Sequence, residues 1–133
     1  MELLVWLALF WATPVHASVL TVPIAYAQEI VWTPEMVKDL AVKESKKHGL
    51  NTKRFLAVID CESRFEPKGQ SNHYKNGVRE KSYGAVQIYL PAHPTITREM
   101  AEDPSFAIPW MAEQWDKFDN AKIWSCYNDL FNS

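Results

Sequence analysis

The segment from Phe55 to Phe65 constrains the fold of this chain more than any other, because its apolar residues recur at helical spacing. Phe55, Ile59 and Glu62 stand at positions i, i+4 and i+7, so they share one face of a helix. That face begins in a hydrophobic core and ends at a carboxyl group. Burial at the edge of an apolar face raises the pKa of a carboxyl group. The alternative interpretation of Glu62 is an ordinary surface residue near the C-terminus of a helix.

Signals for the start and end of helices surround this segment. Thr33 followed by Pro34 predicts a helix start, with a hydroxyl cap and a proline at the first helical position. Gly49 predicts the end of that helix in a left-handed conformation. Asn51 or Thr52 then caps the helix that carries Glu62. The very short connection predicts that the two helices pack as neighbours.

The second half of the chain carries two further helix starts. Thr97 predicts a cap for a short helix that ends at Glu102. Asp103-Pro104 predicts the start of a longer helix that continues to Phe118. Pro109 removes one backbone donor within it, so we expect either a kink there or a helix that begins at this proline.

Residues 66–82 form a polar stretch that is rich in turn-forming residues. Asn76-Gly77 in its middle predicts the turn of a small hairpin. Long polar loops often border functional sites. Residues 121–128 are predicted to be helical, and no further strand is expected. We therefore expect a mainly α fold, with a long polar loop or small hairpin beside a cleft.

Residues 1–27 are predicted to be a signal peptide, and residues 28–133 the mature domain. Residues 3–12 are apolar but too few to span a bilayer as a helix, and residues 25–27 fit the small-x-small pattern that signal peptidase cleaves. The alternatives are cleavage after Ala17 and retention of the segment as a membrane anchor. We therefore expect a secreted, periplasmic or cell-envelope protein.

Two cysteines, Cys61 and Cys126, lie in the predicted mature domain. An even number of cysteines in an exported chain indicates a disulfide, with two free buried thiols as the alternative. The charge is close to balanced, with 14 basic and 16 acidic residues and no basic run. We therefore expect no nucleic-acid partner, since nucleic-acid binding depends on clustered positive charge.

Three separated motifs resemble the lytic transglycosylase domain of the lysozyme-like superfamily. They are Cys61-Glu62-Ser63, Gly84-Ala85-Val86-Gln87-Ile88 and Trp124-Ser125-Cys126. In that family a Glu-Ser pair ends the catalytic helix, and a Gly-Leu-Met-Gln-Ile type motif follows. The two cysteines are similar to those of the resuscitation-promoting factors, in which they pair. The resemblance covers roughly residues 33–128 and implies a lysozyme-like helical domain.

This resemblance implies cleavage of the β-1,4 bond between N-acetylmuramic acid and N-acetylglucosamine in peptidoglycan. Glu62 would protonate the glycosidic oxygen and then take a proton from the C6 hydroxyl, giving a 1,6-anhydro product. Glycosidases usually employ two carboxylates. Asp60 lies on another helix face, and Asp103 and Asp116 are explained as a helix cap and a solvated position. The missing second acid favours a transglycosylase over a hydrolase.

The same motifs supply candidate substrate-binding residues. Ser63 is expected to bond Glu62 or substrate, with a bond to a nearby helix carbonyl as the alternative. Gln87 has both donor and acceptor atoms, which suit acetamido and hydroxyl groups of a sugar. Gly84 allows a close backbone approach at the cleft or simply forms a turn. Three tyrosines are candidates for stacking on sugar faces, with a core role as the alternative: Tyr83, Tyr89 and Tyr127.

No metal or cofactor is expected, because His73 and His93 do not form a ligand pattern. A Ser-His-Asp hydrolase lacks support, since no Gly-x-Ser-x-Gly motif is present. The leading hypothesis is a secreted, monomeric lytic transglycosylase whose partner is the peptidoglycan glycan strand. The alternatives are a lysozyme-type muramidase on the same fold and a non-catalytic glycan-binding module.

Overall fold

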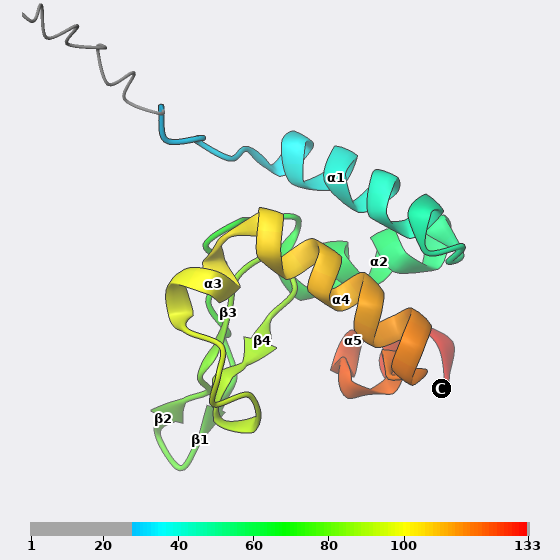
Figure 1. Cartoon of the computed structure of the whole chain (residues 1–133). Helices are drawn as coiled ribbons and strands as arrows, with labels where there is room; N and C mark the ends of the chain where they lie inside the picture. Colours follow the sequence, from blue (N-terminus) through cyan, green and yellow to red (C-terminus); the bar gives the residue numbers. More distant parts are fainter. Residues whose placement is uncertain (1–27, 133) are drawn as a thin grey trace, which may run out of the picture.

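The structure is a computed structural model that describes residues 28–132 (Figure 1). The predicted signal peptide, residues 1–27, lies outside the described residues. The described part is mainly helical, which confirms the predicted fold class. None of its helices is both long enough and apolar enough to cross a membrane.

The first two helices begin and end where the sequence predicts. Helix α1 spans Pro34–Lys47, and the Thr33 hydroxyl accepts a hydrogen bond from the Met36 N–H. Gly49 follows it with a φ of +66°, in the left-handed region. Helix α2 spans Thr52–Ser63, and the Asn51 side chain caps it. Helix α1 packs against both α2 and α4, as Figure 1 shows.

The two helices of the second half also begin at the predicted caps. Helix α3 spans Arg98–Glu102 and is capped by Thr97. Helix α4 spans Pro104–Phe118 and is capped by Asp103. Pro109 lies inside α4, so the helix does not begin at this proline.

The C-terminal segment is divided rather than forming one helix. A 3₁₀ turn, η2, spans Ala121–Ile123, and helix α5 spans Ser125–Phe131. Trp124 between them is extended, with φ −87° and ψ 124°. Its indole N–H donates to the carbonyl of Val86 at 2.7 Å, which holds the end of the chain against the 84–88 segment.

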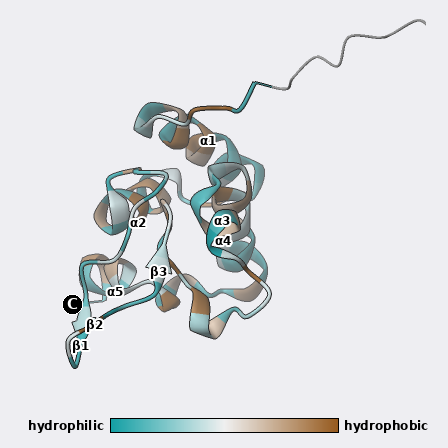
Figure 2. Ribbon diagram, turned by 90° about the vertical axis from the view of Figure 1, so that its left-hand side faces the viewer, coloured by the Kyte–Doolittle hydropathy of each residue, from teal (hydrophilic) through white to brown (hydrophobic). Residues whose placement is uncertain are grey.

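Two short hairpins lie between α2 and α3. Strands β1 (Tyr74–Lys75) and β2 (Val78–Arg79) pair through the predicted turn at 76–77. Strands β3 (Ser82–Tyr83) and β4 (Ile88–Tyr89) form a second pair that was not predicted, because two-residue strands carry no alternating pattern. A 3₁₀ turn, η1 (Leu90–Ala92), follows β4. The β1–β2 hairpin lies at the opposite end of the molecule from α1 in both views (Figures 1 and 2).

The hydrophobic core lies between the helices and the β3–β4 turn. Its large, fully buried side chains come from α1, α2, β4 and α4, and include Val37, Phe55, Ile59, Ile88, Ile108 and Met111. Trp124 is buried at 4% exposure, and Trp110 and Trp115 pack against the core.

A disulfide joins Cys61 to Cys126, so the prediction of a disulfide is confirmed and the alternative of free thiols is wrong. The two Cα atoms lie 5.9 Å apart, and the bond connects the last turn of α2 to the start of α5. It closes a loop of 65 residues. A link of this length stabilises the folded state by about 4 kcal/mol on chain-entropy grounds.

Candidate active site

Glu62 stands in the last turn of α2, where the apolar face of this helix leaves the core. Phe55 and Ile59 on the same face are fully buried, whereas Glu62 is half-buried. Burial raises the pKa of its carboxyl above the ordinary value, and a hydrogen bond from the Cys126 N–H to Oε1 at 3.1 Å opposes this shift. The elevated pKa expected from the sequence is therefore present, and it keeps a larger share of Glu62 protonated near neutral pH.

A cleft of about 580 Å³ opens beside Glu62. Four parts of the chain line it: the end of α2, the loop around the β1–β2 hairpin, the β3–β4 hairpin and the segment from η2 into α5. The polar side chains in its lining are Glu62, Gln70, Ser71, Asn72, His73, Glu80, Ser82, Gln87, Tyr89, Ser125 and Asp129. An acid with a raised pKa at the edge of a polar groove suits proton transfer to a bound carbohydrate.

Gln87 lines this cleft from the turn between β3 and β4. Its φ of +52° lies in the left-handed region, which costs free energy for a residue that is not glycine. The Nε2 atom of Gln87 donates to the carbonyl of Gly84 at 2.8 Å, so the side-chain amide is held by its own turn. The predicted binding role of Gln87 is compatible with this position.

Gly84 does not line the cleft and faces α3 instead. A Cβ atom at this position would lie 1.7 Å from the carbonyl oxygen of Ala101, and the φ of Gly84 is +82°. The close approach that this glycine permits is therefore to the backbone of α3.

Ser63 bonds to backbone carbonyls, the alternative to a bond with Glu62. Its hydroxyl donates to the carbonyl of Ala85 at 2.5 Å and lies 3.4 Å from that of Ile59. Ser63 therefore ties the end of α2 to the β3–β4 turn, and its hydroxyl bonds to these two carbonyls rather than to Glu62. A role for this residue in positioning Glu62 would act through the turn.

The tyrosine candidates lie in different places. Tyr83 packs under the guanidinium of Arg98, 4.5 Å from its ring centroid. Tyr127 packs against Trp115 and Phe131, each ring centroid 5.3 Å away. Neither lines the cleft, whereas Tyr89 does and is 47% exposed. Tyr89 is therefore the tyrosine placed best for stacking on a sugar.

Sequence reasoning missed three ionisable residues of the cleft, His73, Glu80 and Asp129. The negative charges of Glu80 and Asp129 raise the pKa of Glu62 further, and His73 lowers it. One signal was available for two of them: a two-residue turn at 76–77 sets 73 opposite 80 in an antiparallel hairpin. The Glu80 N–H indeed donates to the His73 carbonyl at 2.8 Å.

The other acidic residues considered from the sequence lie elsewhere. Asp60 and Asp103 are absent from the lining of the cleft, and Asp103 caps α4. Asp116 was expected to be simply solvated, but it accepts a hydrogen bond from Nδ1 of His48 at 3.0 Å. His93, the other histidine singled out, packs edge-on against Trp110.

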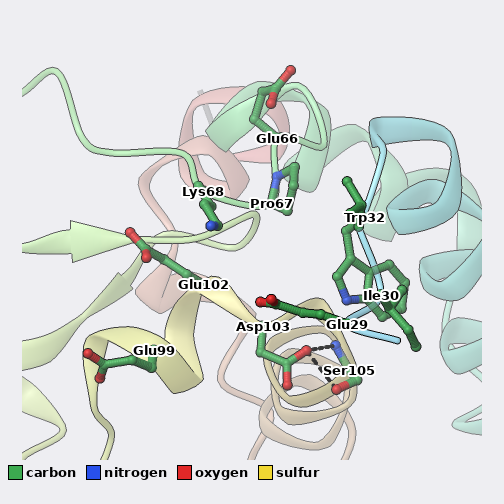
Figure 3. A pocket seen from close by; sticks show the side chains of 11 residues that line it. Glu29, Ile30, Trp32, Glu66, Pro67, Lys68, Glu99, Glu102, Asp103 and Ser105 are labelled. Carbon is green, nitrogen blue, oxygen red and sulfur yellow. Dashed lines mark hydrogen bonds between the residues drawn. The ribbon is translucent and has the colours of Figure 1, made fainter. Parts of the chain in front are cut away.

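A second and larger hollow of about 900 Å³ is lined by the segment before α1, the loop after α2 and the α3–α4 junction (Figure 3). Five carboxylates and one lysine line it: Glu29, Glu66, Glu99, Glu102, Asp103 and Lys68. Asp103 is engaged by the amide and hydroxyl of Ser105, as the dashed lines in Figure 3 show. Glu62 does not line this hollow, so the smaller cleft is the candidate site.

No family model, curated protein or solved structure matches this chain. Within residues 28–132, no three His, Cys, Asp or Glu side chains are grouped closely enough to hold a metal ion.

Proposed function

We propose that this protein is a lytic transglycosylase with a lysozyme-like domain, which cleaves the β-1,4 bond between N-acetylmuramic acid and N-acetylglucosamine in peptidoglycan. One observation carries the proposal: Glu62 is a half-buried carboxyl with a raised pKa at the edge of a polar cleft. The order of the motifs around Glu62 and Gln87 supports this assignment.

In the proposed reaction the proton of Glu62 passes to the glycosidic oxygen. The bond between C1 of the muramic sugar and that oxygen breaks, and its electron pair leaves with the oxygen. The C6 hydroxyl oxygen of the same sugar then bonds to C1, and its proton returns to Glu62. The products are a 1,6-anhydro-muramic end and a free 4-hydroxyl group. A single carboxyl suffices because the substrate supplies the nucleophile.

The proposal includes the setting of the enzyme. The protein is exported by the signal peptide at residues 1–27 and acts as a monomer on glycan strands, without a metal or cofactor. Export agrees with the Cys61–Cys126 disulfide, since such bonds persist in oxidising compartments. Gln87 and Tyr89 are the side chains of the cleft that we assign to binding the sugar.

A hydrolase on the same site is the second candidate, and a specific observation favours it. Glu80 and Asp129 line the same cleft as Glu62, so carboxylates that could serve as the second acid of a hydrolase are present. In a muramidase of this kind, one of these carboxylates would activate a water molecule or stabilise the charged sugar.

The test is mass spectrometry of the soluble products that the purified protein releases from peptidoglycan. Products that end in anhydro-muramic acid are expected, one water lighter than hydrolysed fragments. Reducing-end products would identify the hydrolase instead. Release of no product by a folded protein that binds glycan would indicate the binding module.

The matched variants for this assay are Glu62→Gln and Asp60→Asn. Glu62→Gln removes the acid and is expected to abolish turnover while glycan binding persists. Asp60→Asn removes an exposed carboxylate two residues earlier on the same helix and is expected to leave turnover unchanged. Wild-type turnover by Glu62→Gln would overturn the assignment of the acid.

A further inference from the structure

Glu80 is an exposed glutamate whose side chain is nevertheless held in place. It lies directly after β2, and its N–H donates to the His73 carbonyl at the base of the hairpin. The hydroxyl of Ser82 donates to Oε1 of Glu80 at 2.5 Å, and Ser82 is only 2% exposed. A free surface glutamate loses much rotamer entropy when it is ordered, so a buried hydroxyl aimed at this carboxylate marks a fixed position.

This fixed carboxylate lines the same cleft as Glu62. Four groups there affect the pKa of Glu62: the Cys126 amide, His73, Glu80 and Asp129. The negative charge of Glu80 raises the pKa of Glu62, so Glu80 lies close enough to act on that carboxyl. Glu62 is half-buried, whereas Glu80 is exposed to solvent.

A pair of carboxyl groups beside the scissile bond is the usual arrangement for acid-catalysed glycoside cleavage. In this cleft the half-buried Glu62 would supply the proton, and the exposed Glu80 would face the positive charge that develops at C1 of the sugar. A carboxylate that is already oriented by Ser82 needs no reorganisation when that charge appears.

Building on the proposed function, we propose that Glu80 is a second functional carboxylate of this cleft, which stabilises the positive charge on the sugar ring as the glycosidic bond breaks. Glu62 remains the proton donor. This division of labour applies whether the C6 hydroxyl or water attacks C1, because both routes pass through a positively charged sugar.

The test compares Glu80→Gln with the wild-type protein on peptidoglycan, and measures kcat and KM as a function of pH. The variant is expected to lower kcat by about tenfold or more while KM changes little, since the lost interaction exists chiefly in the transition state. The loss of activity at alkaline pH is expected to begin at a lower pH, because the charge that raises the pKa of Glu62 is gone. This shift reports that Glu80 acts on Glu62, whereas the fall in kcat at nearly constant KM reports the role of Glu80 in the transition state.

Glu66→Gln is the matched control, since it removes the same charge from an exposed residue that does not line the cleft. Ser82→Ala tests the anchor, and is expected to lower kcat in the same direction as Glu80→Gln. Circular dichroism confirms that each variant is folded.

The outcomes separate this inference from the proposed function. If the wild type cleaves peptidoglycan, Glu62→Gln is inactive and Glu80→Gln matches the wild type, only the role of Glu80 is overturned. A loss of kcat that Glu66→Gln shares, or a change confined to KM, overturns it as well. If the wild type releases no product, the proposed function fails and the role of Glu80 fails with it.

Discussion

Replacing Gly84 with alanine is expected to destabilise the fold strongly, because α3 occupies the space that the new methyl group needs. The added Cβ would lie 1.7 Å from the Ala101 carbonyl oxygen and 2.7 Å from its carbonyl carbon. Ordinary van der Waals contact starts at 3.4 Å, so the two backbones must separate. Overpacking of this kind costs about 1–3 kcal/mol, and the left-handed φ of +82° adds roughly 1 kcal/mol. The expected loss is therefore about 2–4 kcal/mol in the free energy of unfolding.

Gly77→Ala provides the control for this experiment. Gly77 has a similar φ of +76°, but an added Cβ would meet nothing within 4 Å. This variant is therefore expected to lose only about 1 kcal/mol, the cost of the left-handed backbone. Both free energies are measured by urea denaturation, with tryptophan fluorescence as the signal. The difference between the two variants isolates the contact between the β3–β4 turn and α3.

Equal stability of the two variants would refute this reasoning, because it would mean that α3 does not rest on Gly84. The result also bears on the site. The turn that begins at Gly84 carries Gln87 into the cleft and accepts the hydrogen bond of Ser63 through Ala85. Catalytic activity is therefore expected to fall in Gly84→Ala and to persist in Gly77→Ala.

Three further predictions concern the elements around the acid. The native protein is expected to have no titratable thiol, and reduction of the Cys61–Cys126 bond to lower the free energy of unfolding by about 4 kcal/mol in urea denaturation. Glu62→Gln is expected to be more stable than the wild type at pH 7 but not well below pH 4.5. The raised folded-state pKa makes wild-type stability fall as pH rises from 4.5 through that value, and glutamine does not titrate. Trp124→Phe leaves the Val86 carbonyl without its donor and is expected to lose about 1–3 kcal/mol, measured in the same way.

The helices could be predicted from the sequence because their ends are determined locally. Thr33, Asn51, Thr97 and Asp103 each bond a backbone N–H two or three residues ahead, so the cap and the helix lie in the same short segment. The β3–β4 hairpin is different. Its turn is held by contacts with α3 and by the Ser63 hydroxyl, both remote in sequence, and its strands of two residues show no periodicity. Such long-range contacts leave no local pattern to detect.

The same contrast between local and long-range contacts explains which residues of the candidate site could be predicted. Glu62 could be predicted because its helix face is a periodic pattern with Phe55 and Ile59. Ser63 follows it by one residue, which turns its side chain about 100° around the helix, towards the Ala85 carbonyl. The position of Glu80 depends on how the hairpin folds over the cleft, and no spacing along the chain relates it to Glu62.

The protonation state of Glu62 links the stability of this domain to its proposed chemistry. Burial raises the pKa of the carboxyl, which suits the proposed role of proton donor, but it also lowers the stability of the fold at pH values where that carboxyl must ionise. The Cys126 amide moderates the shift, and it can do so only while α5 stays beside α2. The disulfide holds α5 beside α2, and the hydrogen bond from Trp124 to the 84–88 segment also keeps the C-terminal segment in place. The C-terminal segment is therefore part of the acid site, and its release should alter the pKa of Glu62 before the helical core unfolds.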